Sequence, residues 1–419
     1  MNNGRTAVAT ISTANYWPYT AVLIESLARI CPEWEVYVLA LNELPESDLR
    51  AKVRILEAKD LWGSDTGLCQ ARFNLFEWAA ASKPRLLRFL LDNADASLAV
   101  YVDSDIEFFA PPDSIEQAGS IVLTPNVAAL EECASAAWER IHLQYGCFNT
   151  GFLALRDTPE SRSFVDWWDA RLTRYCCTDP WLDIFSDQRW LDLAPGLFPG
   201  VVVDRNPALN VATWNLAGRR LRSSDGRFWV GERPLGFFHY HRVRLGMDVQ
   251  SYFAEVDNHP ATRELVEEYL KKAKRHVTAG QVDSGRHDRQ ADGALLPPII
   301  YRAIRDTAAE HLLPLDPREA PAGLTERLRH MSFANPRLRA RLRVLAYHSA
   351  HTRQAFLCEQ EIDRYQRSWL YRIWIDLWYI WHAPRQAQMP LNWTLNSEWL
   401  RRSRKGVAAI LRAVRLPLQ

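Results

Sequence analysis

The sequence lacks the features that define several protein classes. Its seven cysteines include no Cys-x-x-Cys spacing, which argues against a disulfide framework and against a zinc site. No run of 18 apolar residues occurs, so no transmembrane helix is predicted. The first residues lack a basic stretch followed by an apolar segment, and no internal repeat is evident. We therefore expect a cytoplasmic protein with reduced cysteines, and neither a secreted chain nor a solenoid.

The composition is that of a globular protein. The chain has 419 residues, of which 47% are hydrophobic and 24% charged, enough for a sizeable core and for two or three domains. Its net charge of +1 hides an asymmetry, because residues 1–250 carry 24 basic and 32 acidic side chains while the rest carry 27 and 18. The two parts are expected to meet different partners.

Short apolar runs alternate with segments of helical period up to about residue 240. This pattern predicts βα units and an α/β fold, built on a mostly parallel sheet with helices on both faces. Pro84 and Pro159 stand where a proline can open a helix. The predicted strands are 6–11, 35–41, 53–57, 98–103, 120–123, 151–155 and 236–240, and the predicted helices are 19–29, 70–81, 84–91, 130–143 and 159–174.

The pattern changes after residue 250. We expect a domain over 1–250, a helical and loop extension over 251–320, and a helical region over 321–419. Within the last region, residues 367–384 are rich in tryptophan, which indicates a packed helix or an interfacial one. Residues 401–419 hold six basic and no acidic side chains, typical of a solvated tail or of a segment that binds an anionic membrane surface. No nucleic-acid motif accompanies this charge, so no nucleic-acid partner is expected.

One segment points to chemistry. Residues 98–109 read LAVYVDSDIEFF, a buried type of strand that leads directly into Asp103 and Asp105. Ligands of open α/β sheets bind beyond the carboxyl ends of the strands, where these side chains would emerge. Two such carboxylates can bind Mg²⁺ or Mn²⁺ and leave positions open for phosphate oxygens. A solvated turn after a strand is the alternative interpretation.

Several motifs together resemble a known family. Residues 73–109 are similar to the region around the Asp-x-Asp motif of GT-A glycosyltransferases, particularly glycosyltransferase family 8, which includes glycogenin and bacterial lipopolysaccharide galactosyltransferases. The likeness extends over about residues 6–245. Five further patterns recur in the family's order, namely VATISTANYWPYTAVLIESL, GCFNTGFLAL, SDQRWLDL, NPALNVATWNL and GFFHYH. The resemblance implies a Rossmann-like GT-A fold with a helical carboxyl-terminal extension, and a nucleoside-diphosphate sugar as donor.

The resemblance also implies roles for individual residues. Asp103, Asp105 and His239 would be the metal ligands, small hydroxyls and a ring after the first strand would line the nucleotide pocket, and other polar groups would face the donor. The nucleotide and donor residues are Thr10, Ser12, Thr13, Tyr16, Lys83, Ser104, Asn149, Thr150 and Gly151, and the catalytic candidates at the sugar are Asp187 and Gln188.

The chain departs from the family after the histidine. Family members continue to a glycine and then to a lysine that contacts the diphosphate, whereas this chain reads His239-Tyr240-His241-Arg242-Val243-Arg244. Arg242 or Arg244 can take the place of the lysine, because a guanidinium binds phosphate through two hydrogen bonds. The departure leaves His241 as an alternative to His239.

Each of these positions also has a purely structural interpretation. Thr13 and its neighbours suit a helix N-cap, Lys83 suits a solvated helix end, and the Asn149–Gly151 stretch suits a tight turn. Asp187 and Gln188 could be an exposed polar pair. The five ordered matches favour the functional interpretation.

The sequence therefore predicts a metal-dependent glycosyltransferase that uses Mn²⁺ or Mg²⁺. We expect a UDP-linked donor, a saccharide or lipid-linked saccharide acceptor, retention of anomeric configuration, a place in cell-surface polysaccharide or glycolipid synthesis, and peripheral attachment to the inner face of the membrane. Two alternatives stay open. One is a haloacid-dehalogenase-type phosphatase that uses the Asp-x-Asp motif, and the other is a non-catalytic carbohydrate-binding or membrane-associated protein with the same fold.

Overall fold

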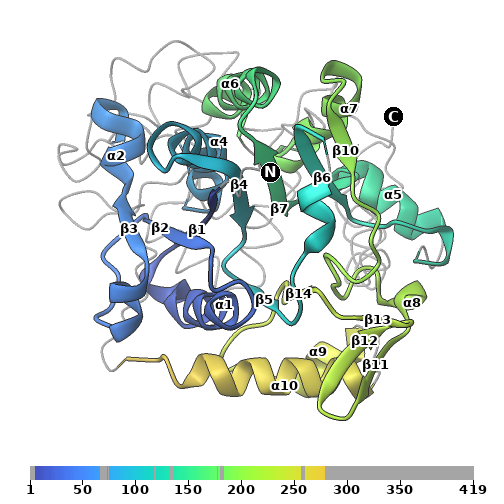
Figure 1. Cartoon of the computed structure of the whole chain (residues 1–419). Coiled ribbons are helices and arrows are strands. Elements are labelled where there is room, and N and C mark those ends of the chain that lie inside the picture. The colour runs from blue at the N-terminus through green and yellow to red at the C-terminus, as the bar shows by residue number, and fades with distance from the viewer. Residues whose placement is uncertain are drawn as a thin grey trace, which may run out of the picture. The chain divides into compact units, whose positions relative to one another are not determined.

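The structure is a computed structural model of the chain (Figure 1). It describes residues 5–66, 73, 75–117, 119–132, 136–176, 178–179, 184–255 and 260–278. Contacts divide the chain into a unit over 1–287 and a unit over 288–419, and the second lies wholly outside the described residues. The predictions for residues 321–419, and those for 251–320 beyond residue 278, therefore also lie outside the described residues.

A sheet of seven strands forms the centre of the described unit. Its order is β10-β6-β7-β4-β1-β2-β3. All neighbours pair in parallel except β7, which is antiparallel to both β4 and β6. This mixed, mostly parallel sheet confirms the predicted fold class. The strands are β1 (Arg5–Ser12), β2 (Glu35–Ala40), β3 (Arg54–Glu57), β4 (Ala96–Val102), β6 (Ile121–Pro125), β7 (Phe148–Arg156) and β10 (Val201–Val203).

Helices cover both faces of the sheet because β1 is apolar on both sides. Ala7, Ala9 and Ile11 pack with α4 (Leu75–Asn93) and α6 (Pro159–Tyr175). Val8 points to the other face, where it packs with α1 (Trp17–Ile30) (Figure 1). A strand buried on both faces is typical of parallel sheets enclosed by helices.

Shorter elements complete the described unit. The remaining helices are α2 (Ala58–Trp62), α5 (Ala136–Tyr145), α7 (Ala194–Leu197), α8 (Leu216–Arg219), α9 (Val249–Glu255) and α10 (Pro260–Lys274), with 3₁₀ turns η1 (Ala14–Tyr16), η2 (Asp48–Lys52), η3 (Gly63–Asp65), η4 (Asp113–Gln117), η5 (Leu130–Glu132) and η6 (Gln188–Leu193). The strands outside the large sheet are β5 (Ile106–Phe108), β8 (Thr178–Asp179), β9 (Ile184–Phe185), β11 (Leu221–Ser224), β12 (Arg227–Val230), β13 (Arg233–Pro234) and β14 (Phe237–His239). No helix in the described part of the chain has the length and apolarity that crossing a membrane requires.

One helix prediction is wrong. Pro84 does not open a new helix but lies inside α4, which continues to Asn93. Pro159, by contrast, stands in the first turn of α6, and the Thr158 side chain caps that helix by accepting from the Ser161 backbone N–H. The continuation of α4 buries Lys83, so the interpretation of this lysine as a solvated helix end is also wrong.

A small antiparallel ladder lies beside the large sheet. β5 follows the Asp-x-Asp turn and pairs with β14, so that His239 stands opposite Ile106. The Tyr240 N–H donates to the Asp105 carbonyl over 2.8 Å, and the His239 N–H donates to the Val211 carbonyl at the same distance. This ladder brings the second half of the chain to the end of β4.

Candidate functional site

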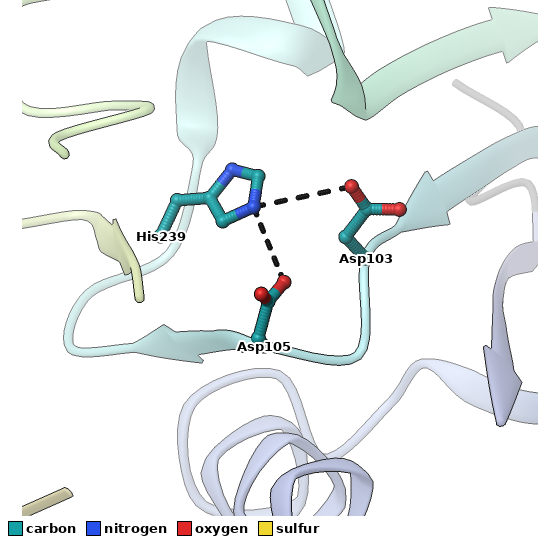
Figure 2. Close-up of side chains that lie close together, drawn as sticks. All are labelled: Asp103, Asp105 and His239. Carbon is teal, nitrogen blue, oxygen red and sulfur yellow. Dashed lines mark ion pairs between the residues drawn. The ribbon is translucent and has the colours of Figure 1, made fainter. Parts of the chain in front are cut away.

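Two carboxylates and an imidazole meet beyond the carboxyl end of β4. The Nε2 atom of His239 lies 3.2 Å from Asp105 Oδ1 and 3.9 Å from Asp103 Oδ2. Figure 2 shows all three side chains pointing toward one another. Their ligand atoms lie within 4.8 Å of each other. We call these three residues the triad.

A glycine makes room for the triad. A Cβ atom placed on Gly151 would lie 2.8 Å from Asp103 Oδ2, 2.7 Å from His239 Cε1 and 2.6 Å from Asn149 Oδ1. No side chain fits there without displacing the triad. The Gly151 carbonyl also accepts from the Asp103 N–H over 2.8 Å, which fixes the start of the Asp-x-Asp turn.

Residues 149–151 belong to a strand that begins earlier than the predicted 151–155, so the alternative interpretation of this stretch as a tight turn is wrong. They lie inside β7, at a point where its register against β6 shifts between Leu123 and Thr124. The Asn149 side chain accepts from the Gly151 N–H over 2.8 Å and donates to Asn126 Oδ1 over 3.1 Å. A strand irregularity of this kind is a common way to aim side chains at a site.

The charges of the triad influence one another. Burial alone would raise the pKa of Asp105, but His239 and then Arg244 and His241 outweigh it and lower this pKa to about 2. Burial alone would lower the pKa of His239, but Asp105 and Asp103 raise it above its ordinary value of 6.5. The two carboxylates therefore favour positive charge at this position.

Lys83 joins the triad to a third acidic residue of the site, Asp187. Its Nζ atom lies 3.2 Å from Asp103 Oδ1 and 2.8 Å from Asp187 Oδ2. It also donates to the Thr150 carbonyl and to Thr150 Oγ1, each over 3.3 Å. Burial alone would lower the pKa of Lys83, yet Asp103 and Asp187 raise it, so the ammonium stays charged. Asp187 is thus buried and paired, not an exposed polar residue.

The polar residues at the end of β1 are buried, and two of them bond to protein groups. Ser12 Oγ lies 2.7 Å from Thr20 Oγ1, and Thr13 Oγ1 donates to Asn15 Oδ1 over 2.6 Å. Thr13 occupies the N-cap position of η1, but its side chain makes no capping hydrogen bond. Thr10 Oγ1 has no hydrogen-bond partner among the described residues. A buried hydroxyl without a partner is uncommon in proteins.

Arg244 connects this region with the triad. Its guanidinium donates to the Tyr16 hydroxyl over 2.6 Å, lies 5.0 Å from the centre of the Tyr16 ring and approaches Asp105 Oδ2 to 4.0 Å. Arg242 is exposed and has a left-handed backbone, with φ of 64°. Of the two cations, the structure brings Arg244 to the carboxylates.

The remaining predicted residues lie around the same centre. Ser104 is buried between the two aspartates. Gln188 begins η6, accepts from the Thr150 N–H over 3.4 Å and donates to the Tyr145 carbonyl over 3.0 Å. The His241 ring is 6.4 Å from the His239 ring, and His239 alone of the two belongs to the triad.

The donor set fits a divalent cation. Two carboxylates and one imidazole are ligands that Mn²⁺ accepts, and a group of three leaves further coordination positions open. Asp105 is buried and Asp103 half-buried, and the glycine at position 151 leaves the space in which their carboxylates approach each other. The triad can thus hold a metal ion.

Two proteins of Bacillus subtilis are similar to the chain in sequence. No family model matches the chain. The uncharacterized protein YfnD of Bacillus subtilis (strain 168) is 24% identical over 306 residues, which cover 70% of this chain and 94% of YfnD. The uncharacterized protein YfnF of the same organism is 25% identical over 237 residues, which cover 54% of this chain and 78% of YfnF.

Solved structures of glycosyltransferases are also similar to the chain. The galactosyltransferase LgtC, solved in complex with donor and acceptor sugar analogs, aligns with a TM-score of 0.43 and 15% identity, over 66% of this chain and 100% of LgtC. The glycosyltransferase GlyE of Streptococcus pneumoniae aligns with a TM-score of 0.39 and 15% identity, over 65% of this chain and 63% of GlyE.

Sequence reasoning missed two residues that shape the site. Asn126 stands at the end of β6, and its side chain donates to the Gly146 carbonyl over 2.7 Å. Trp214 packs edge-on against the His239 ring, with centroids 5.2 Å apart. Trp214 lies within the NPALNVATWNL pattern, which was the one available signal for it. Asn126 had no signal, because its role depends on contacts with distant segments.

Proposed function

We propose that the chain is a metal-dependent glycosyltransferase that moves a sugar from a nucleoside-diphosphate sugar to a hydroxyl acceptor. The observation that carries this proposal is the triad, with two carboxylates and an imidazole converging within 4.8 Å at the carboxyl end of β4. This is the edge of an α/β sheet where ligands bind. Asp103, Asp105 and His239 would hold the cation.

The leaving diphosphate requires positive charge. When bound, the divalent cation would neutralise part of the charge that develops on the departing phosphate. Arg244 stands 4.0 Å from Asp105 on the same side and would donate to a phosphate oxygen, and Arg242 is the second candidate. We assign the nucleotide to the side of the site formed by Thr10, Ser12, Thr13 and Tyr16, where Tyr16 offers a ring to the base.

The sugar would lie on the other side of the triad, toward Lys83. Asp187 holds the Lys83 ammonium, which keeps a buried cation beside Asp103. Gln188, Asn149, Thr150, Gly151 and Ser104 complete this side as donor-contacting candidates. The pairing of Asp187 with Lys83 makes Asp187 a weak nucleophile, which favours proton uptake from the acceptor hydroxyl by the departing phosphate.

The finer assignments rest on the sequence resemblance. We propose UDP as the nucleotide, Mn²⁺ as the ion, retention of anomeric configuration, and a saccharide or lipid-linked saccharide as acceptor. A role in cell-surface polysaccharide or glycolipid synthesis, at the inner face of the membrane, agrees with such an acceptor. NMR of the product anomer tests retention, and an inverted product contradicts it.

A ligand screen tests the proposed function. Thermal stability of the full chain is measured with each nucleoside diphosphate, with and without Mn²⁺, because a ligand that binds the native state stabilises it by RT ln(1 + [L]/Kd). We expect one nucleotide to raise Tm only when Mn²⁺ is present. If no nucleotide does so at millimolar concentration, the proposal is wrong.

Turnover then separates an enzyme from a binding protein. Slow hydrolysis of the matching sugar nucleotide, dependent on the metal, is expected of the enzyme, whereas metal-dependent binding without any hydrolysis or transfer supports the non-catalytic alternative. None of the contacts of the triad favours the phosphatase alternative. A phosphatase of this type would use Asp103 as its nucleophile and carry the motif after the first strand, whereas here the motif follows β4.

A further inference from the structure

The imidazole of the triad has an unusual environment. His239 is buried and turns Nε2 toward the carboxylates. Its other ring nitrogen, Nδ1, has no hydrogen-bond partner within the part of the chain that the structure describes. A histidine that binds a metal almost always donates its second N–H to a carboxylate, a carbonyl or water, and this bond fixes the orientation of the ring. A contact with a neighbouring ring can serve the same purpose.

That contact is Trp214. The two ring centroids are 5.2 Å apart and the ring planes meet at 79°, an edge-to-face arrangement. The same indole meets the His241 ring at 5.6 Å and 73°. Edge-to-face contact between rings at this separation is a favourable arrangement. Trp214 therefore restricts the rotation of both imidazoles that compete for the role of ligand.

The indole itself is anchored. Trp214 Nε1 donates to the Asn126 carbonyl over 3.1 Å, and Asn215 Nδ2 donates to the same oxygen over 2.9 Å. The Asn126 side chain in turn holds the Gly146 carbonyl and the Asn149 side chain. Since Asn149 accepts from the Gly151 N–H, this network joins the indole to the glycine beside the triad.

We propose that Trp214 is a positioning residue for the metal site. It holds the His239 ring with Nε2 toward Asp105 through an aromatic edge contact, in place of the hydrogen bond that such a histidine normally makes. Its anchor on Asn126 sets the ring position relative to Asp103 and Gly151. This inference rests on the proposed metal site, and its test uses metal binding in place of sugar transfer.

The first test measures the affinity of the full chain for Mn²⁺ alone, by electron paramagnetic resonance of the free ion. Trp214→Leu should weaken binding about 10- to 100-fold, the range observed when partners of metal ligands are removed. Trp214→Phe keeps an aromatic edge but loses the N–H, so a smaller loss is expected. Trp229→Leu is the matched control, because Trp229 lies on the β11–β12 hairpin against Arg222. It should leave the affinity unchanged.

A double-mutant cycle distinguishes positioning from general stability. If Trp214 acts through the imidazole, Trp214→Leu should cause no further loss of Mn²⁺ affinity in a His239→Ala background. Nitrogen hyperfine coupling to bound Mn²⁺ should be present in the wild type and reduced in Trp214→Leu. Near-UV circular dichroism shows whether each variant is folded. If Trp214→Leu is unfolded, the same comparison is made with Trp214→Phe.

Two results would overturn the inference while leaving the proposed function intact. One is wild-type Mn²⁺ affinity in a folded Trp214→Leu variant. The other is an equal loss of affinity with and without His239. A wild-type chain that binds no Mn²⁺ at all contradicts the proposed function as well, so the two failures are distinct.

Discussion

Asp105 and Glu107 are two buried carboxylates separated by one residue, and their surroundings differ. Glu107 lies on β5 and is neutralised by the protein: Lys272 of α10 pairs with it, the Tyr240 hydroxyl donates to it over 3.2 Å, and Arg29 lies 3.8 Å away. Asp105 faces a second carboxylate and an imidazole, and its nearest guanidinium is 4.0 Å away.

The difference separates a structural charge from a functional one. A buried charge must be paired. At Glu107 the protein itself supplies the partners of the charge, and the pair with Lys272 links α10 to β5 (Figure 1). At Asp105 the fold brings two acids together, and under the proposed function a cation from solution supplies part of the compensation. Four experiments test this distinction.

The largest effect is expected from the two carboxylates themselves. Asp105→Asn should lower Mn²⁺ affinity and sugar transfer at least about 100-fold, because it removes a charged ligand. Glu107→Gln should instead lower the free energy of unfolding by about 3 kcal/mol, since it leaves Lys272 without its buried partner. Metal titration and urea unfolding of both variants check this. Equal loss of metal affinity in the two would remove the distinction.

Lys83 and Lys272 each pair with buried acidic residues and extend the comparison to the basic partners. Lys83→Met leaves Asp103 and Asp187 without their cation, so turnover should fall roughly 10- to 100-fold and the free energy of unfolding by about 3 kcal/mol. Lys272→Met should reproduce the loss of stability, with kcat nearly unchanged at a temperature where it is folded. A loss of kcat as large as that of Lys83→Met would contradict the separation.

The two arginines after the triad sharpen the comparison further. Arg244→Met should weaken binding of the metal–nucleoside diphosphate about tenfold, because one charge-assisted hydrogen bond is lost. It should not weaken Mn²⁺ binding alone, since a guanidinium near Asp105 repels a cation. Arg242→Met is the control and should have little effect. Calorimetric titrations decide between the two arginines, and the reverse order of effects would assign the phosphate to Arg242.

The smallest effect is expected on the stability of the protein at acidic pH. The pKa of Asp105 is about 2 in the folded chain, below its ordinary value of 3.8, so its ionisation stabilises the native state above pH 4. This contribution, about 2 kcal/mol, should be lost as the pH falls from 4 to 2. In urea unfolding over this range, Asp105→Asn should lose less stability than the wild type. Parallel pH dependence in both proteins would show that Asp105 is not responsible.

Much of the fold and of the triad could be predicted from sequence. Strands such as β1 and β4 are continuous apolar runs, and β4 leads directly into Asp103, so the position of the Asp-x-Asp pair at a strand end follows from local pattern. His239 could be predicted as a partner because it also ends an apolar run. Local pattern and family resemblance agreed at these residues.

The errors come from contacts that sequence pattern does not contain. Pro84 was expected to open a helix, but packing of α4 against α6 and the sheet outweighs the loss of one backbone donor. The burial of Lys83 follows from the same packing. Which arginine approaches the carboxylates depends on the left-handed backbone at Arg242. This turn is followed by Arg244, whose guanidinium lies against Tyr16. None of these has a local signature.

The β5–β14 ladder also bears on how the protein matures. Three residue pairs join β5, which follows Asp105, to β14, which ends at His239, and more than a hundred positions separate the two strands in the sequence. A slip of one position would turn the imidazole to the opposite face. During synthesis from the amino terminus, affinity for a divalent ion should consequently emerge only after β14 has docked, which makes ion uptake a reporter of completed folding.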